Sequence, residues 1–455
     1  MTATTTDLRA RVTSLMPEAH QDLSELVACQ SVADPREFPA SECLKAAQLV
    51  IDKFTAAGLR DVRLEDTPDG HPAVYGEIPA PAGAPTVVLY CHYDVQPPLD
   101  PTGTAWKSPP FTLTERDGRW YGRGAADCKG NIVAHLTALR ALNGDIPVGI
   151  KLISEGSEEQ GTGGLEALIK SRPDLLRADA IIVADTGNFA LGVPTLTTTL
   201  RGMATVVVTV NTLETAMHSG MFGGPAPDAL QALIRMLATL RDERGNTTIH
   251  GLPSDGTWQG VDYPAAQFTA DAHVLDHVDL LGDGRVQDML WSRPAVTVLG
   301  IDCPPVVGSA PAVPAQARAL VSLRVPPGVE ARHAQDNLIA HLESVVPWHA
   351  HVQIDRDTVG EPFTARTEGP AYKTMTDAME KAFGHHGTTE GQGGSIPLCN
   401  TLHTIYPDAE IMLIGDEEPR CLIHAPNESV DPAEIERIAL AEALFLQQYG
   451  AAAQR

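Results

Sequence analysis

The stretch VGIKLISEGSEEQGTGG, residues 148–164, decides the fold of this chain. Its first part, residues 148–153, is a short apolar run followed by polar and glycine residues, and such a run predicts a buried strand. Glu158 and Glu159 come directly after this strand. Of two adjacent carboxylates, one can bind a metal ion while its neighbour handles protons, so the stretch indicates a two-metal hydrolase.

Related patterns lie on both sides of this stretch. Residues 86–90 and 180–184 are short apolar runs, and residues 131–142 place apolar side chains at helical spacing. Further helices are predicted over residues 8–29, 41–57 and 432–449. Strands that alternate with helices favour an α/β fold with a mixed, mostly parallel sheet.

The middle of the chain has a different pattern. Strands are predicted over residues 204–210, 295–301, 317–325 and 350–354, and helices over residues 227–241 and 329–345. Their order, βαββαβ, is that of a ferredoxin-like domain. We therefore expect a catalytic domain from residues 1–198 and 362–455, and an inserted domain over residues 199–361.

Metal-competent side chains stand where the predicted strands of the first domain end. His92 follows the run at 86–90, and Asp185 follows the run at 180–184. Asp127 lies in the loop before the helix at 131–142. Ligands of open α/β sheets bind beyond the carboxyl ends of the strands. We therefore expect these side chains to meet the adjacent glutamates at one edge of the sheet.

The segment His92-Tyr93-Asp94 adds a second carboxylate near the histidine. In an extended chain, residues two apart face the same side, so Asp94 can orient the imidazole of His92. Histidines that bind metal ions usually have such a partner.

Composition restricts the class of protein. The 455 residues include 58 acidic and 33 basic ones, and the formal net charge of -25 argues against nucleic-acid binding. No run is apolar for long enough to cross a membrane, and the N-terminal residues do not form a secretory signal. The seven cysteines are scattered without a CxxC pair. We therefore expect a cytoplasmic protein with reduced thiols.

Seven motifs together resemble one known family. They are CHYDVQPP at 91–98, GRGAADCKGN at 122–131, SEGSEEQGTGG at 154–164, ADTG at 184–187, MHSGMFGG at 217–224, GGSIP at 393–397 and LIHAPNES at 422–429. With these motifs the chain resembles, over nearly its whole length, the zinc-dependent aminoacylase, carboxypeptidase and dipeptidase family. It is most similar to the carnosinase-like dipeptidase branch. The resemblance implies hydrolysis of unblocked dipeptides.

The resemblance also implies a site for two divalent metal ions. The ligands carried over are His92 and Asp185 for one ion, Glu159 and His424 for the other, and Asp127 as the bridge between them. Zinc is the expected metal, and the same ligands suit manganese or cobalt. A hydroxide bridging the two ions would be the nucleophile, and Glu158 would be the general base.

Other residues match positions that bind substrate in this family. His218 resembles a histidine that reaches the active site of a partner subunit, which implies a homodimer with the inserted domain as lid and dimerisation domain. Its imidazole would stabilise the oxyanion. Arg324 resembles the arginine that holds the C-terminal carboxylate of the substrate. Ser395, with the backbone of Gly393 and Gly394, would complete this clamp.

The chain departs from the family pattern at two places. Cys128 follows Asp127 where the family often has a second aspartate, at a peptide bond that is commonly cis. Residues 389–392 lack an arginine that some relatives have nearby. Asp185, where other branches have glutamate, favours the peptidase branches. The alternatives are an N-acyl-amino-acid deacylase or glutamate-type carboxypeptidase on the same fold, and a catalytically silent metal-binding protein.

Overall fold

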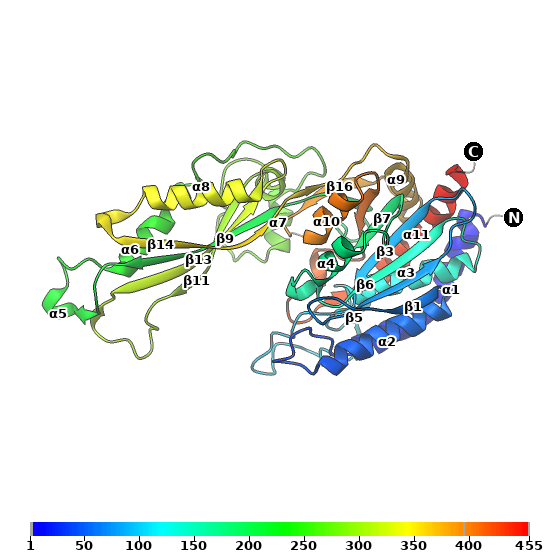
Figure 1. The fold of residues 1–455 in the computed structure, drawn as a ribbon, viewed down its shortest axis with the longest axis horizontal. Helices are drawn as coiled ribbons and strands as arrows, with labels where there is room; N and C mark the ends of the chain where they lie inside the picture. The colour runs from blue at the N-terminus through cyan, green and yellow to red at the C-terminus, as the bar shows by residue number, and fades with distance from the viewer. Residues whose placement is uncertain (1–2, 395, 454–455) are drawn as a thin grey trace. The chain divides into compact units, whose positions relative to one another are not determined.

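The computed structural model describes residues 3–394 and 396–453. The chain divides into two compact units, each of which is described by itself. The first unit comprises Met1–Thr198, Ala365–Glu390 and Leu398–Arg455, and the second comprises Thr199–Thr364 and Gly391–Pro397. We call the second the inserted unit. The fold class expected from the sequence, an α/β protein with an inserted ferredoxin-like domain, is confirmed (Figure 1).

A nine-stranded mixed sheet runs through the first unit in the order β1-β2-β6-β3-β7-β17-β8-β15, and β16 pairs with β8. Its strands are β1 (Arg60–Glu65), β2 (Ala73–Ile78), β3 (Thr86–His92), β6 (Gly149–Glu155), β7 (Ala180–Ala184), β8 (Thr195–Leu200), β15 (Phe363–Thr364), β16 (Thr388–Gln392) and β17 (Glu410–Ile414). The four central strands, β6, β3, β7 and β17, are parallel, and β2 and β8 pair antiparallel with their outer members. β7 and β17 are buried along their whole length, as the apolar runs predict.

Helices cover this sheet. They are α1 (Thr5–Val27), α2 (Ala40–Ala56), α3 (Lys129–Leu142), α4 (Gly164–Ser171), α9 (Pro370–Phe383), α10 (Pro397–Ile405) and α11 (Pro432–Ala453). α3 contacts β3, α9 contacts β17, and α1 and α11 pack against α3. α1 begins with a capping box, in which Thr4 and Asp7 satisfy each other's backbone N–H groups.

A small sheet brings two distant segments of the first unit together. It has the order β18-β5-β4, from β4 (Thr114–Arg116), β5 (Arg119–Tyr121) and β18 (Ser429–Val430). The pairing of β18 with β5 is antiparallel and joins Ser429 to Tyr121. The loop that follows β5 therefore lies beside the segment that precedes β18.

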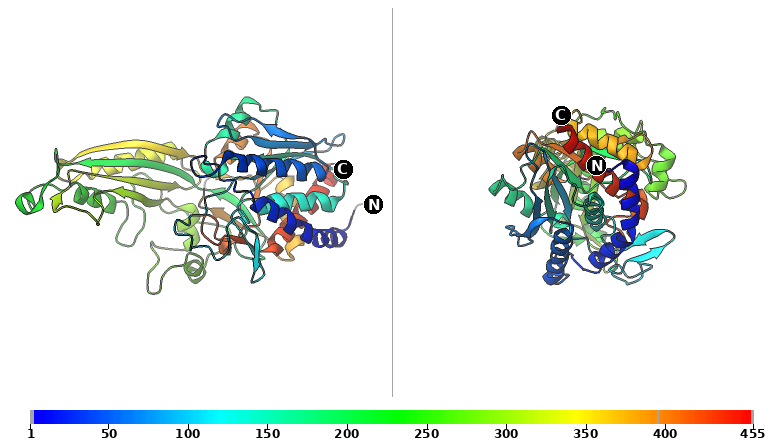
Figure 2. Two further views of the ribbon diagram at one scale, coloured as in Figure 1. Left: turned by 90° about the horizontal axis from the view of Figure 1, so that it is seen from below. Right: turned by 90° about the vertical axis from the view of Figure 1, so that its right-hand side faces the viewer.

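The inserted unit has the predicted βαββαβ order. Its main elements are β9 (Gly202–Asn211), α6 (Ala229–Ala238), β11 (Ala295–Asp302), β13 (Gln316–Val325), α8 (Ala331–Ser344) and β14 (His351–Gly360). The antiparallel sheet has the order β11-β13-β9-β14, and α6 and α8 pack against it (Figure 2). α6 begins after Asp228, whose carboxylate accepts a hydrogen bond from the N–H of Gln231.

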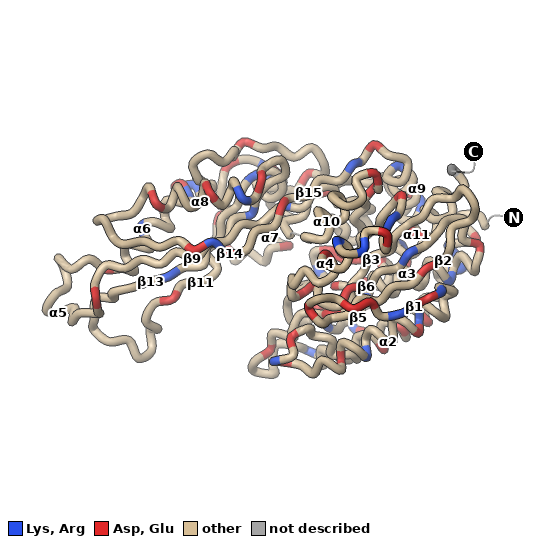
Figure 3. Tube along the Cα trace, in the orientation of Figure 1, with Lys and Arg blue, Asp and Glu red and all other residues tan. Residues whose placement is uncertain are grey.

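Shorter elements complete the inserted unit. They are β10 (Met217–His218), α5 (Ser219–Phe222), α7 (Ala265–Asp271) and β12 (Ala312–Val313). β10 and β12 form a two-stranded sheet. Acidic positions are spread along both units (Figure 3). Among the residues described, no helix is long and apolar enough to span a bilayer.

Candidate metal centre

The carboxyl ends of the parallel strands bring the metal-competent side chains together. His92 is the last residue of β3, and Asp185 directly follows β7. Glu158 and Glu159 form a 3₁₀ turn shortly after β6. Asp127 reaches the same place from the loop before α3. The expected meeting at one edge of the sheet is therefore observed for all five side chains.

Asp127 lies between two imidazoles. Its Oδ1 is 2.9 Å from Nε2 of His92, and its Oδ2 is 2.9 Å from Nε2 of His424. Nε2 of His92 is also 3.1 Å from Oδ1 of Asp185. Nε2 of His424 is also 3.1 Å from Oε2 of Glu159. A carboxylate that faces two separate histidine–carboxylate pairs is a suitable donor set for two neighbouring divalent ions.

A thiol stands beside the first of these pairs. The ligand atoms of Cys128, His92 and Asp185 lie within 4.8 Å of one another. Sγ of Cys128 donates a hydrogen bond of 2.9 Å to the carbonyl of Ala184. Burial raises the pKa of the Cys128 thiol well above its usual value, which favours this protonated form. The bond between Asp127 and Cys128 is cis, as the resemblance implies.

Asp94 contacts the imidazole and both glutamates. Nδ1 of His92 is 3.1 Å from the backbone oxygen of Asp94 and 3.4 Å from its Oδ1. The Asp94 carboxylate accepts hydrogen bonds from the backbone N–H groups of Glu158 and Glu159, at 3.2 and 3.1 Å. When Nδ1 carries the proton of the neutral ring, the Nε2 lone pair faces the carboxylates, which is the arrangement of a metal ligand.

The cluster is strongly anionic. Hydrogen bonds with Asp127 and Glu159 raise the pKa of His424 to about 11. Burial and the charge of Asp127 raise the pKa of Glu159 to about 7. Burial and the charge of Asp185 raise the pKa of Glu158 well above its usual range. Carboxylates crowded together contribute to all three shifts, and burial adds to the shifts of the two glutamates; a divalent cation stabilises such an environment.

A buried ion pair holds the loop that carries Asp127. Oε2 of Glu428 is 2.6 Å from the guanidinium of Arg123, and both side chains are buried. Oε1 of Glu428 accepts hydrogen bonds from the N–H groups of Ala126 and Asp127, both at 3.1 Å. Sequence reasoning missed Glu428 because its partner Arg123 lies 305 residues away along the chain.

A further carboxylate was also missed. Asp127, Asp185 and Glu417 form a third group whose oxygens lie within 4.8 Å of one another. Glu417 is the third residue after β17, as Glu158 is the third residue after β6. The strand-end rule that selected Asp185 would have found Glu417 after the apolar run at 411–414.

The arginine expected to hold the substrate lies in the inserted unit beside a second one. Burial lowers the pKa of Arg324, and burial with the charge of Arg324 lowers the pKa of Arg201 to about 10. Among the residues described, Nε and one terminal nitrogen of Arg201 have no hydrogen-bond partner. A Cβ at Gly393 would lie 2.7 Å from the Arg201 guanidinium, so glycine leaves room for it. In the part of the chain that the structure describes, neither guanidinium forms an ion pair with a carboxylate, and two such groups favour an anion.

Two other residues that the sequence predicts in the site, His218 and Gly394, are exposed. His218 is exposed at the start of α5, and its Nδ1 accepts a hydrogen bond of 3.1 Å from the N–H of Gly220. A Cβ at Gly394 would meet no atom within 4 Å. Ser395 lies outside the described residues.

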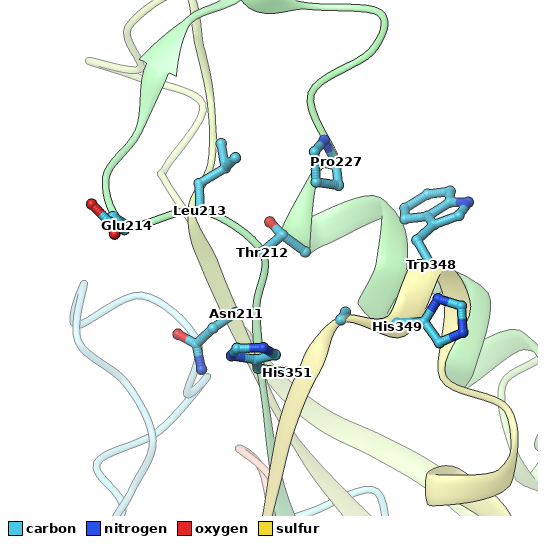
Figure 4. A pocket seen from close by; sticks show the side chains of 9 residues that line it. Asn211, Thr212, Leu213, Glu214, Pro227, Trp348, His349 and His351 are labelled. Atoms are coloured by element: carbon cyan, nitrogen blue, oxygen red, sulfur yellow. The ribbon is translucent and has the colours of Figure 1, made fainter.

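A pocket of about 260 Å³ in the inserted unit contains none of the predicted site residues. Trp348 and His349 lie on one side of it, Asn211 and His351 lie next to each other on another, and Pro227 lies apart from both pairs (Figure 4). We therefore place the candidate site at the metal-competent cluster and not at this pocket.

Comparison with known proteins agrees with the geometry of the cluster. The family described as Peptidase family M20/M25/M40 matches residues 88–448, a range that includes every side chain of the centre. The chain belongs to this peptidase family. As a member of the M20/M25/M40 family it is an enzyme, a hydrolase of the metallopeptidase type, as the sequence predicted.

Relatives in the M20/M25/M40 family align with this chain over nearly its whole length. Cysteinylglycine-S-conjugate dipeptidase of Corynebacterium striatum is 45% identical over 439 residues, which are 94% of this chain and 95% of the relative. The structure of human carnosine dipeptidase 1 aligns with a TM-score of 0.82 and 25% identity, over 98% of this chain and 99% of its own. The di-peptidase Dug1p of Saccharomyces cerevisiae has the same fold, with a TM-score of 0.84 and 21% identity over 99% of each chain.

Proposed function

We propose that the protein is a dipeptidase that depends on two divalent metal ions and cleaves unblocked dipeptides. The observation that carries this proposal is the position of Asp127, whose two carboxylate oxygens each face a separate histidine–carboxylate pair. Zinc is the expected metal, with manganese and cobalt as metals that the same donors accept. When bound, the ions would supply Lewis-acid activation of water and of the scissile carbonyl.

Glu158 is the proposed general base. Its neighbour Glu159 is turned toward His424, while Glu158 is near Asp185 and outside both ligand sets. A carboxylate with a raised pKa accepts a proton from water and later returns it to the leaving amine. The backbone of Glu158 is held by Asp94, which keeps the base beside the ligands.

Arg324 is the proposed anchor for the C-terminal carboxylate of the substrate, together with Ser395 and the backbone of Gly393 and Gly394. The neighbouring Arg201 supports this role because it adds a second buried positive charge that no described carboxylate neutralises. A dipeptide carries this carboxylate within one residue of the scissile bond. Recognition of a carboxylate this near the scissile bond would therefore favour dipeptides over longer peptides.

The proposed assembly is a homodimer formed through the inserted unit, in which His218 stabilises the oxyanion in the partner's site. The apolar side chains of Val298, Leu299 and Ile301 are exposed on β11, which pairs only with β13 among the described strands. An edge strand with exposed apolar side chains favours association with a second copy. The seven free cysteines support a reducing compartment, and we assign the protein to the cytoplasm.

Hydrolysis by protein stripped with a chelator tests the function. Zinc, manganese or cobalt is added back, and the substrates are free dipeptides, their C-terminal amides, tripeptides and N-acetylated amino acids. Because one relative is named for cysteinylglycine S-conjugates, cysteinylglycine and its S-alkyl forms belong among the dipeptides. We expect metal-restored cleavage of free dipeptides only. Preferred cleavage of N-acetylated amino acids would instead assign the deacylase activity.

A further inference from the structure

Glu417 reaches the metal centre from the end of β17. β17 and β7 are parallel neighbours, and the segments that follow them continue side by side. The N–H of Asn188 donates a hydrogen bond of 2.8 Å to the carbonyl of Glu417. A Cβ at Gly187 would lie 2.4 Å from that carbonyl oxygen, so glycine permits this close approach. The backbone of Glu417 is therefore fixed beside the loop that presents Asp185.

Within the described part of the chain, the side chain of Glu417 has no partner that accounts for its burial. Glu417 is only 7% exposed, and no hydrogen bond or ion pair to its carboxylate is found in residues 3–394 and 396–453. Its neighbour Glu418 differs, because its carboxylate is 2.6 Å from the guanidinium of Arg119. The Asp416 carboxylate also has no hydrogen-bond partner among the described residues, but it lies beside Gly130 and belongs to none of the three metal-competent groups. A buried carboxylate without a donor is costly unless a cation lies nearby.

The side chains around Glu417 are suitable ligands for such a cation. An oxygen of Glu417 lies within 4.8 Å of oxygens of Asp127 and Asp185, which are ligands in the proposed centre. Three carboxylates brought so close together repel one another, and the repulsion is removed when a divalent ion shares them. The two imidazoles of the centre pair with Asp127, and among the described residues neither forms a hydrogen bond or ion pair with Glu417.

We propose that Glu417 is a further carboxylate of the metal centre, in addition to the five ligands that the resemblance implies. It holds a divalent ion, or a water on that ion, at the side of Asp127 and Asp185. This inference rests on the proposed two-metal site and adds a residue to it. Such partners of metal ligands typically change metal affinity by about 10- to 100-fold.

The test compares Glu417→Gln with Glu390→Gln in the full chain. Glu390 lies on β16, is also 7% exposed and stands outside all three metal-competent groups, so it is a matched buried carboxylate. Calorimetric titration of the stripped proteins with Mn²⁺ measures affinity. We expect Glu417→Gln to bind about 10- to 100-fold more weakly than the wild type and Glu390→Gln to bind within about twofold of it.

Thermal unfolding with and without Mn²⁺ separates a metal role from a structural one. Loss of a repelling carboxylate should leave the Tm of the stripped Glu417→Gln protein unchanged or higher, while the Tm increase on adding Mn²⁺ becomes smaller. A lower Tm with an undiminished Mn²⁺ increase, or an affinity within about twofold of wild type, would overturn the inference. Wild-type protein that binds Mn²⁺ but cleaves no dipeptide would contradict the proposed function and leave this comparison valid.

Discussion

Each residue of the metal centre is held by partner residues. Sequence motifs predicted some of these partners and missed others. Asp94 was predicted to orient His92 because residues two apart in an extended chain face the same side, and the observed contact is to both the backbone and the carboxylate of Asp94. Arg201 and Glu428 were missed because their contacts join positions far apart in the chain. Local spacing predicts which side chains share a strand end, but only the folded chain shows which loops those ends meet.

Glu158→Gln tests the general base. The amide keeps the size of the side chain but cannot accept a proton, so we expect turnover to fall by about 10²- to 10⁴-fold while both metal ions stay bound. Steady-state hydrolysis of a free dipeptide and metal analysis of the purified variant measure the two effects. Turnover close to that of the wild type would remove Glu158 from this role.

Glu428→Gln tests the support of the Asp127 loop. The change leaves Arg123 buried without its counter-ion, and we expect the free energy of unfolding to fall by about 3 kcal/mol. Metal affinity should also fall, by about 10-fold or more, because the N–H of Asp127 loses a charged acceptor. Denaturant titration and metal titration measure these changes. Glu115→Gln, an exposed position, is the control, and equal effects of both changes would contradict the assignment.

At the level of elements, apolar runs predicted the strands well. The helical spacing of apolar residues predicted the ends of the helices less well. Residues 180–184 were predicted as a strand and form β7 over the same range. α3 begins at Lys129, two residues before the predicted start at residue 131. Lys129 lies before the first apolar residue of the predicted helix, but its ammonium group is fully buried and donates to the carbonyls of Leu26 and Cys29. A buried lysine that binds the end of another helix has no signature in local hydrophobicity.

A buried ion pair between α3 and α11 makes stability depend on pH. Nδ1 of His135 is 2.6 Å from Oε2 of Glu442, and Nε2 faces the carbonyl of Tyr90 at 3.2 Å. Burial lowers the pKa of His135, but the charge and hydrogen bond of Glu442 outweigh this effect, so that the pKa is raised. A raised pKa stabilises the folded state fully below the usual value near 6.5, and the contribution is lost as pH rises through the higher folded pKa.

We therefore expect His135→Gln to lower the free energy of unfolding by about 3 kcal/mol near pH 6 and by less at higher pH. Urea unfolding of both proteins across this pH range measures the difference. The control is His386→Gln, which removes an exposed pair with Glu380 and should change stability by no more than about 0.5 kcal/mol. A difference that grows with pH would contradict the assigned sign.

At the level of the whole molecule, the order of elements predicted the inserted ferredoxin-like unit, but not its full extent. Gly391–Pro397 also belongs to the inserted unit, although the rest of that unit ends at Thr364. Secondary-structure order assigns a segment by its neighbours in sequence, whereas membership of a compact unit depends on tertiary contacts. The residues Gly393 and Gly394, expected in the substrate clamp, are part of this returning segment.

Subunit exchange tests whether His218 acts in a partner's active site. His218→Ala and Glu158→Gln should each be inactive alone, because each lacks one catalytic group. After mixing, a heterodimer would contain one site with both groups intact, so we expect activity to recover to about a quarter of the wild-type level at random exchange. Each variant incubated alone is the control. Absence of recovery despite exchange, measured with differently tagged chains, would count against action across the dimer.

The position of His424 in the chain also has a consequence for biosynthesis. His92, Asp127, Glu159 and Asp185 are all translated before the inserted unit, and His424 with α11 comes after it. At ordinary rates of about 5–20 residues per second, the ribosome needs on the order of ten seconds or more between the two groups. During that interval the nascent chain has one histidine of the centre and most of its carboxylates, but no complete second site. On the proposed ligand set we therefore expect tight metal binding, and with it peptide cleavage, only after the inserted unit and His424 have been translated.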